Sequence, residues 1–174
     1  MRKLALLVAC AALAGFALGC ARPKEEGAGK QDQAKAQYQS PKVEEYPVPA
    51  PLKQALPGLV NDKIRIYKEI SPTVNLVAYF PDYSLDKAVN AASQAFLVLL
   101  ENPAFKAGVD FWIIQVQPEK GPGVLVWGVK PSEAEAFAKS RDLKAFFADS
   151  EYVLINDQII DKGEPRLKYL ATSK

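Results

Sequence analysis

The segment FWIIQVQPEKGPGVLVWGV, residues 111–129, decides the fold class of this chain. Its two ends, 111–117 and 124–129, are rich in β-branched and aromatic residues, and such runs are typical of strands. Residues 119–123 between them contain two glycines and a proline, which predict a turn. The segment therefore predicts two strands that follow one another directly, and the elements on either side decide how many more join them.

On either side of this segment the sequence predicts one strand and one long helix. Upstream, residues 75–80 form a strand, and Ser84 begins a helix over 85–101 whose apolar residues recur at helical spacing. Downstream, Pro131 opens a second helix, and Ser132 with Glu135 has the spacing of a capping box. The apolar stripe stops at 140–142, Ser140 begins a shorter helix through 147, and residues 151–155 form a last strand.

The two halves of this region have similar patterns. A shift of 48 residues superposes 76–79 on 124–127, and a shift of 41 superposes 110–114 on 151–155. Either an internal duplication or the chance likeness of two amphipathic segments explains this. Both give the element order βαββαβ, which predicts a ferredoxin-like α+β two-layer sandwich with two helices on one face of an antiparallel sheet. An alternating segment at 64–70 adds an extra N-terminal strand.

The N-terminus has the composition of an export signal. Arg2 and Lys3 precede the uncharged apolar run 4–18, which is short for a membrane-spanning helix and suits a cleaved signal peptide. The residues Ala17-Leu18-Gly19-Cys20 resemble the lipobox of bacterial lipoproteins, with Ala17 where that pattern prefers Leu. The resemblance implies cleavage before Cys20 and acylation of Cys20. It also implies a lipid anchor in the bacterial cell membrane or the outer membrane, with the protein outside the cytoplasm in the periplasm. Ala21 after the cysteine favours the outer membrane.

The next segment differs sharply in composition from the rest of the chain. Residues 20–60 are rich in Ala, Lys, Gln, Glu and Pro and have few large apolar residues, so we expect a disordered tether. A docking strip at the proline-rich residues 46–51 is the alternative interpretation. The predicted organisation is a signal peptide at 1–19, a lipidated tether at 20–60 and an α+β domain at 61–174.

Several classes of function are excluded by composition. Without Arg2 and Lys3 the chain has 20 basic and 20 acidic residues, and nucleic-acid binding needs a basic face. There is no histidine, Cys10 lies in the signal peptide and Cys20 is expected to be acylated. Catalysis by Ser-His-Asp or Cys-His groups and zinc sites are thereby excluded, and we expect no cofactor and no metal. An enzyme using the carboxylates of Asp82, Asp86 and Asp110 is the least favoured hypothesis.

One sheet face is the candidate partner-contact surface. Strand alternation assigns Trp112, Ile114 and Val116 to the side of the helices. It leaves a second face of aromatic, apolar and polar residues, formed by Phe111, Ile113, Gln115, Tyr152, Leu154 and Asn156 and joined by Val77, Tyr79, Leu125 and Trp127. The alternative is that strand 64–70 and the tail 166–170 cover this face as core. Six residues of this second face are the candidate contact residues: Tyr79, Phe111, Ile113, Leu125, Trp127 and Tyr152.

These patterns predict a lipid-anchored envelope protein with a small, non-catalytic interaction domain that contacts the membrane through its lipid and binds an envelope protein partner. The alternative function is a lipoprotein that binds a small ligand between sheet and helices, near Phe96, Leu99 and Phe137.

Overall fold

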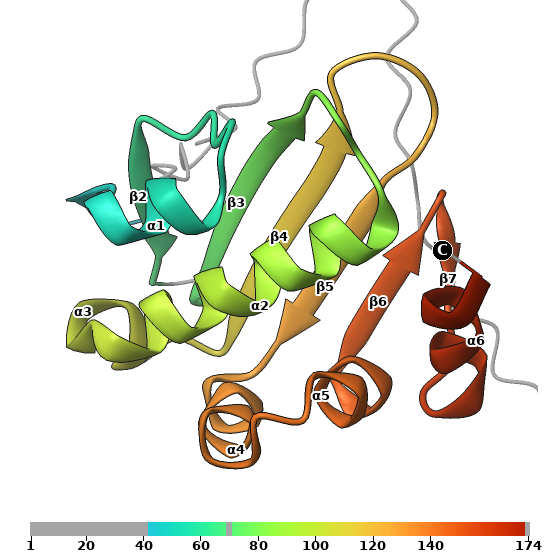
Figure 1. Ribbon diagram of the computed structural model, residues 1–174. Helices are drawn as coiled ribbons and strands as arrows, with labels where there is room; N and C mark the ends of the chain where they lie inside the picture. The colour runs from blue at the N-terminus through green and yellow to red at the C-terminus, as the bar shows by residue number, and fades with distance from the viewer. Residues whose placement is uncertain (1–41, 69–70, 173–174) are drawn as a thin grey trace, which may run out of the picture. The chain divides into compact units, whose positions relative to one another are not determined.

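The computed structural model describes residues 42–68 and 71–172, which form a mixed structure of helices and a five-stranded sheet (Figure 1). This confirms the predicted α+β class. The strand order across the sheet is β3-β4-β5-β6-β7, and β1 pairs with β2 separately. The strands are β1 Val43–Pro47, β2 Lys63–Tyr67, β3 Thr73–Phe80, β4 Phe111–Pro118, β5 Leu125–Val129, β6 Tyr152–Ile155 and β7 Gln158–Ile159. The helices are α1 Ala50–Ala55, α2 Leu85–Glu101, α3 Pro103–Lys106, α4 Pro131–Ser140, α5 Leu143–Asp149 and α6 Glu164–Thr172.

The strand directions differ from the predicted ferredoxin-like sheet. Strands β3 and β4 are parallel and directly adjacent, and each later neighbouring pair is antiparallel. A split βαβ unit would have another strand between its two parallel strands. The predicted order of elements along the chain is present, but the sheet is neither split nor fully antiparallel.

The break between α4 and α5 explains why β6 runs antiparallel to β5. Arg141 has left-handed backbone (φ 56°) and ends α4, and the Asp142 carboxylate accepts a hydrogen bond from the Ala145 amide (3.0 Å) and begins α5. Figure 1 shows both helices nearly end-on beside one end of the sheet. A parallel crossover has to return the chain along the strands. Two short helices at one end do not, so β6 begins where β5 ends and runs antiparallel to it.

The helix starts follow local sequence, with one correction. Ser84 caps α2 as predicted, since its hydroxyl accepts a hydrogen bond from the Lys87 amide (3.3 Å). The capping box predicted at Ser132 and Glu135 is wrong. Pro131 occupies the first turn of α4, so the Lys130 amide donates to the Glu133 carboxylate instead (2.8 Å).

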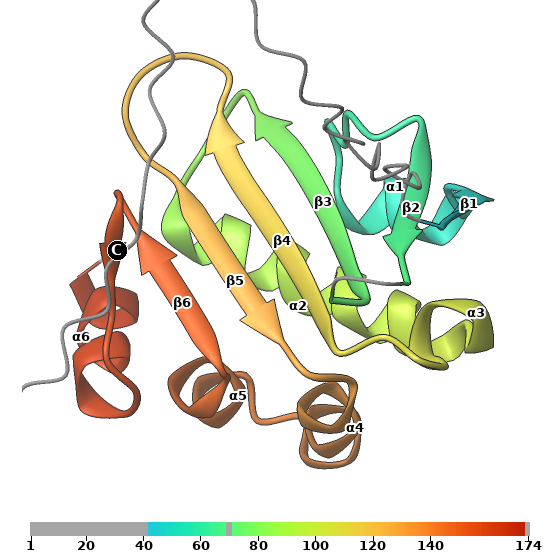
Figure 2. The same ribbon diagram turned by 180° about the vertical axis from the view of Figure 1, so that it is seen from behind.

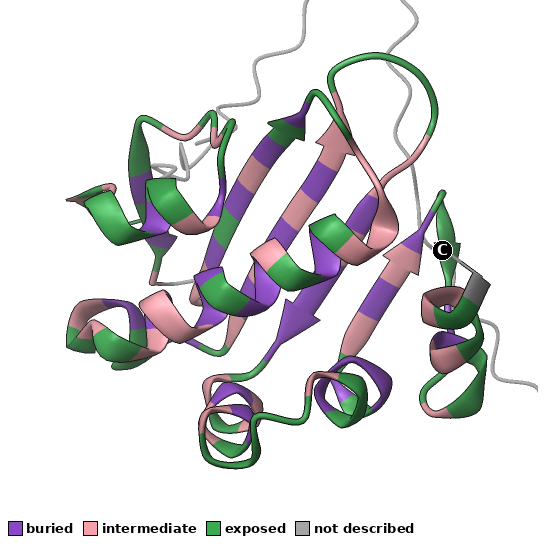
Figure 3. Ribbon diagram, in the orientation of Figure 1, coloured by how far each residue is buried: buried purple, intermediate pink, exposed green. Residues whose placement is uncertain are grey.

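The core lies between the sheet and α2, α4 and α5. Figure 3 shows buried positions alternating with intermediate or exposed ones along β3, β4 and β6, as expected for strands with one covered face. Trp127 is at the centre, in contact with the rings of Phe96, Phe146 and Phe147 at centroid distances of 5.2, 4.9 and 5.1 Å. Its indole N–H donates to the Ser150 hydroxyl (2.7 Å), so its polar group is satisfied within the core.

The folded region begins earlier than predicted. Strand β1 and α1 lie within the segment 20–60, which was expected to be a disordered tether, and Leu52 and Leu56 are fully buried. Tyr46 packs edge-on against Phe105 at 5.5 Å. The proline-rich residues 46–51 therefore lie at the end of β1, at the start of α1 and between them, and docking of a partner to them stays a prediction.

The segment between α1 and β2 runs along the outer edge of β3 without forming a further strand of the main sheet. Leu59 forms an isolated bridge with Ala78, and the Tyr79 amide donates to the Gly58 carbonyl (3.0 Å). The Asn61 side chain accepts a hydrogen bond from the Val77 amide (2.8 Å). These bonds occupy the outer edge of β3 and block it from pairing with another chain.

The C-terminal helix is held by a buried arginine. Arg166 in α6 has 2% of its surface exposed. Its Nη1 donates to the carbonyl oxygens of Ser150 (2.5 Å) and Ala148 (3.2 Å), and its Nε donates to that of Ile160 (3.0 Å). Burial lowers the pKa of Arg166 from its ordinary value. The guanidinium thus meets the C-terminal carbonyls of α5, where positive charge is favourable.

Candidate functional site

One face of the sheet has no helix over it among the described residues. Figure 2 shows β3 to β6 in front and α2 behind them. Strand pairing sets the residues of this face in rows: Asn75, Ile113, Gly128 and Tyr152 form one, and Val77, Gln115, Val126 and Leu154 the next. Thr73 with Phe111 and Tyr79 with Gln117 extend the pattern on β3 and β4. We call these twelve residues the open face.

Four of the six predicted contact residues lie on the open face. Tyr79 is 37% exposed, and Phe111, Ile113 and Tyr152 are half-buried. Leu125 and Trp127 do not belong there. Leu125 pairs with Val116 and Trp127 with Ile114, on the face that the helices cover, and both are fully buried.

This correction has a simple cause. Alternation along β5 shows which residues share a face but not which face it is. The larger residues of β5, Leu125 and Trp127, pack under the helices, while Val126 and Gly128 point to the open face. In the sequence, the smaller side chains at positions 126 and 128 were the signal that these positions belong to the open face. Besides Gly128, the open-face residues that the prediction missed are Thr73, Asn75, Gln117 and Val126.

None of the twelve open-face residues has a charged side chain. Its polar groups are amides and hydroxyls, and Gln115 donates a hydrogen bond to Gln117 (3.0 Å). Gly128 is buried because Tyr152, its cross-strand neighbour, and Ile113 flank it. Charge begins only at the margin, where the Lys130 ammonium lies 5.6 Å from the centre of the Phe111 ring and forms an ion pair with Glu151 (3.2 Å). Depletion of charge is typical of the centre of protein interfaces.

Strand 64–70 and the tail 166–170, which were the alternative prediction for what covers this face, do not lie over it. Strand β2 pairs with β1, in a two-stranded unit that we call the N-terminal arm, and its Ile64 and Ile66 are fully buried. Residues 166–170 belong to α6, which packs on α5 and lines a groove with α2. Among the described residues, the open face is therefore uncovered.

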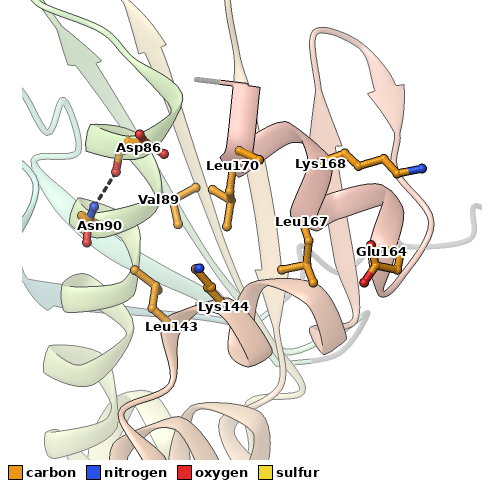
Figure 4. Close-up of a pocket in the computed structure, with 10 residues that line it drawn as sticks. Asp86, Val89, Asn90, Leu143, Lys144, Glu164, Leu167, Lys168 and Leu170 are labelled. Carbon is orange, nitrogen blue, oxygen red and sulfur yellow. Dashed lines mark hydrogen bonds between the residues drawn. The ribbon is translucent and has the colours of Figure 1, made fainter. Parts of the chain in front are cut away.

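A groove lies between α2, α5 and α6 (Figure 4) and has a volume of about 590 Å³. Val89, Leu143, Leu167 and Leu170 give it an apolar lining, and Asp86, Asn90, Lys144, Glu164 and Lys168 supply polar groups at its margin. Of the three residues near which a ligand site was predicted, Phe96 and Leu99 are fully buried in the core. Phe137 stacks on Phe146 at 4.4 Å and lines a small pocket of about 180 Å³ beside α4 and α5. A ligand at this place stays a prediction.

Of the three acidic residues considered for catalysis, Asp86 lies in the first turn of α2, and the other two are separated. Asp82 follows the C-terminal end of β3, whereas Asp110 precedes the N-terminal end of β4. Because β3 and β4 are parallel and in register, these positions lie at opposite ends of the sheet. Within residues 42–68 and 71–172, no three His, Cys, Asp or Glu side chains are grouped to hold a metal ion.

The surface carboxylates instead form ion pairs. Glu151 accepts hydrogen bonds from Lys130 and Lys162 (3.2 and 3.3 Å), which lower its pKa below the usual 4.5. Glu45 is held in the same way by Lys63 and Arg65, and its pKa is also lowered. These groups are solvent-exposed and stabilise the fold only modestly.

Cys20 and the rest of the predicted signal and lipid-attachment region lie outside the described residues. No helix in the described part of the chain has the length and apolar character needed to cross a membrane. Comparison with protein-family models, curated proteins and solved structures finds no match for this chain.

Proposed function

We propose that this chain is a lipid-anchored bacterial envelope protein whose folded domain binds a protein partner through the open face. The membrane anchor is the acylated Cys20, and the domain lies outside the cytoplasm. The observation that supports the binding role most directly is the uncovered face of β3 to β6, which has aromatic, aliphatic and amide side chains and no charge. Nucleic acid and anionic lipid surfaces require basic residues that this face lacks.

The anchor is tested by membrane fractionation of Cys20→Ala. This variant should move from the membrane to the soluble fraction and should lose incorporation of labelled palmitate. Cys10→Ala is the matched control, because Cys10 lies in the segment that is removed, and it should remain in the membrane. Equal membrane association of both variants would refute the anchor.

The binding role is tested by pull-down from envelope membranes with the full lipidated chain. Wild type should retain a discrete protein partner, and Val126→Lys should lose it, since the new charge lies in the middle of the open face. Ser132→Lys on the exposed surface of α4 is the control and should retain it. Retention by Val126→Lys would show that the open face is not the contact surface.

The second candidate function is binding of a small amphipathic ligand, and the groove of Figure 4 favours it. Its volume lies within the range of about 300–1,000 Å³ that is typical of ligand sites. The probe 1-anilinonaphthalene-8-sulfonate tests this function. Its fluorescence should rise with wild-type protein and much less with Leu170→Gln, while Val126→Gln on the opposite side of the sheet should match wild type. No rise with the wild type would exclude the groove as an apolar binding site.

A further inference from the structure

We infer that the groove between α2, α5 and α6 binds an amphipath with a single aliphatic chain and a zwitterionic head, the chemistry of a lysophospholipid. This inference rests on the second candidate function, because it names the class of ligand for the same groove. Three observations support it: the groove has an aliphatic lining, its volume suits one chain, and its margin has acidic and basic side chains in equal number.

The apolar part of the groove is aliphatic. Figure 4 shows Val89 on α2 opposite Leu170 on α6, with Leu143 of α5 at the lower end of the groove in this view. Val89 is buried, but the three leucines are only half-buried, so they retain apolar surface that a ligand can remove from water. None of the ten described residues that line the groove is aromatic. Aromatic ligands gain from stacking on aromatic side chains, so this lining favours a flexible aliphatic chain.

The volume of the groove distinguishes between classes of occupant. A helix of a protein partner is about 10 Å wide and rises about 5.4 Å per turn, so each turn fills roughly 400 Å³. The groove of about 590 Å³ would hold only about one and a half such turns. A methylene group is about as large as a water molecule, whose share of the liquid is about 30 Å³, so the groove holds about 20 such groups. One aliphatic chain fits this volume, whereas a lipid with two long chains exceeds it.

A single chain also suits a groove on a membrane-anchored domain. One acyl chain gives only marginal and reversible membrane binding, whereas two chains hold a lipid firmly in the bilayer. Single-chain amphipaths are therefore the lipids that leave the membrane readily and can be captured from water by an open groove.

The margin of the groove has charges of both signs. Asp86 lies on α2, Lys144 on α5, and Glu164 and Lys168 on α6 (Figure 4). Within the described part of the chain, neither Asp86 nor Lys144 forms an ion pair with another residue, so both charges are accessible to a ligand. A head with one sign of charge would meet like charge as well as opposite charge at this margin. A zwitterionic head can instead pair with both signs, and this complementarity is a source of specificity.

Photolabelling in membranes tests this inference with the full lipidated chain. The probe is lysophosphatidylethanolamine with a diazirine in its acyl chain, which attaches to neighbouring residues on illumination. Mass spectrometry of the wild type should find the label in α2, α5 and α6, and an excess of unmodified lysophosphatidylethanolamine should suppress it. Leu167→Trp should fill the groove and lower the labelling about tenfold. Ser132→Trp on the exposed surface of α4 is the matched control and should be labelled like the wild type.

A second variant covers the case in which Leu167→Trp fails to fold. Ala171 also lines the groove but is exposed, so Ala171→Trp obstructs the groove without disturbing the core. This variant should keep the circular dichroism melting curve of the wild type and also lose labelling about tenfold. Equal labelling of Ala171→Trp and Ser132→Trp would place the lipid elsewhere and overturn the inference.

The head is tested with two further probes that have the same diazirine chain, an anionic fatty acid and an uncharged monoacylglycerol. The zwitterionic probe should label the groove about threefold more than either of them. Lys144→Gln should reduce this preference, because it removes one of the two basic groups at the margin. Equal labelling by all three probes would overturn the zwitterionic head.

The other outcomes separate the ligand from the groove. A rise in 1-anilinonaphthalene-8-sulfonate fluorescence without photolabelling of α2, α5 or α6 would overturn the lipid ligand and leave the groove as an apolar binding site. No rise would refute the second candidate function and this inference with it. Loss of the pulled-down protein partner in Ala171→Trp, with no photolabelling of the wild-type groove, would assign the groove to that partner and overturn the lipid.

Discussion

Replacing Arg166 with Met should destabilise the domain by about 3 kcal/mol. Methionine retains much of the side-chain volume but cannot donate hydrogen bonds. The two shortest bonds, to the carbonyl oxygens of Ser150 and Ile160, are bonds from a charged donor and contribute roughly 1.5–3 kcal/mol each. Relief of the cost of burying the guanidinium offsets part of this loss, whereas each buried carbonyl left without a donor costs about 1–3 kcal/mol.

Urea unfolding measures this effect. With a slope of about 2 kcal/mol per molar urea, the midpoint of Arg166→Met should fall by about 1.5 M with an unchanged slope. Arg65→Met is the matched control, because Arg65 is exposed and solvent screens its ion pair with Glu45, so its loss should hardly move the midpoint. A midpoint for Arg166→Met at or above that of the control would refute the reasoning. Such a result would mean that the hydrogen bonds from the guanidinium to the carbonyl groups at the end of α5 do not stabilise the fold.

Three further predictions follow from the same structure. Gly58→Ala should lower the free energy of unfolding, measured in urea, by about 3 kcal/mol, because the φ of Gly58 is +82° and a Cβ would collide with the Tyr79 carbonyl. Gly121→Ala is the control: its φ is +90° but a Cβ would have open space, so this variant should lower the free energy of unfolding by about 1 kcal/mol. The thermal midpoint should fall as the pH drops below about 4.5 and through the lowered pKa of Glu151, because the ion pairs of Glu151 stabilise the fold only while this side chain is ionised. Glu151→Gln should make this decrease smaller. An unchanged decrease in Glu151→Gln would show that Glu151 does not contribute to the pH dependence of stability. The fluorescence of the two tryptophans should be blue-shifted and protected from iodide in the native state, since both are fully buried, and ready quenching before urea is added would contradict the packing of the core.

The parts of the fold that depend on neighbouring residues were predictable from sequence. Helix α2 has the predicted bounds, because the Ser84 cap, the apolar stripe and Asn102-Pro103 at its end are all local signals. Strand β4 likewise begins at Phe111 as predicted. These features need no knowledge of what the element packs against.

The parts that depend on distant residues were not predictable. Residues 43–56 resemble a linker in composition, yet Leu52 and Leu56 are buried by packing with the rest of the domain. The direction of β6 depends on how α4 and α5 turn at Arg141, a residue whose left-handed conformation has no signal in its side chain. Local propensity therefore gave the elements but not their connection in space.

The candidate site shows the same division. Alternation grouped Phe111, Ile113 and Gln115 correctly, because one strand determines its own period. The assignment of Trp127 required the register of β5 against β4, which pairs it with Ile114. Register is a property of two strands, and the size of the side chains on β5 was the sole hint of it in the sequence.

The N-terminal arm also determines how the domain would respond to mechanical load. If Cys20 is fixed in a membrane, tension between membrane and domain enters at the start of β1. The first contacts to carry it are the hydrogen bond from the Lys68 amide to the Lys42 carbonyl (3.1 Å) and the ion pair between Glu44 and Lys68 (3.3 Å). Because β1 pairs with β2 alone, β1 would peel from β2 before the pairing of β3 with β4 was disturbed. The arm would thus lengthen under strain while the open face kept its shape.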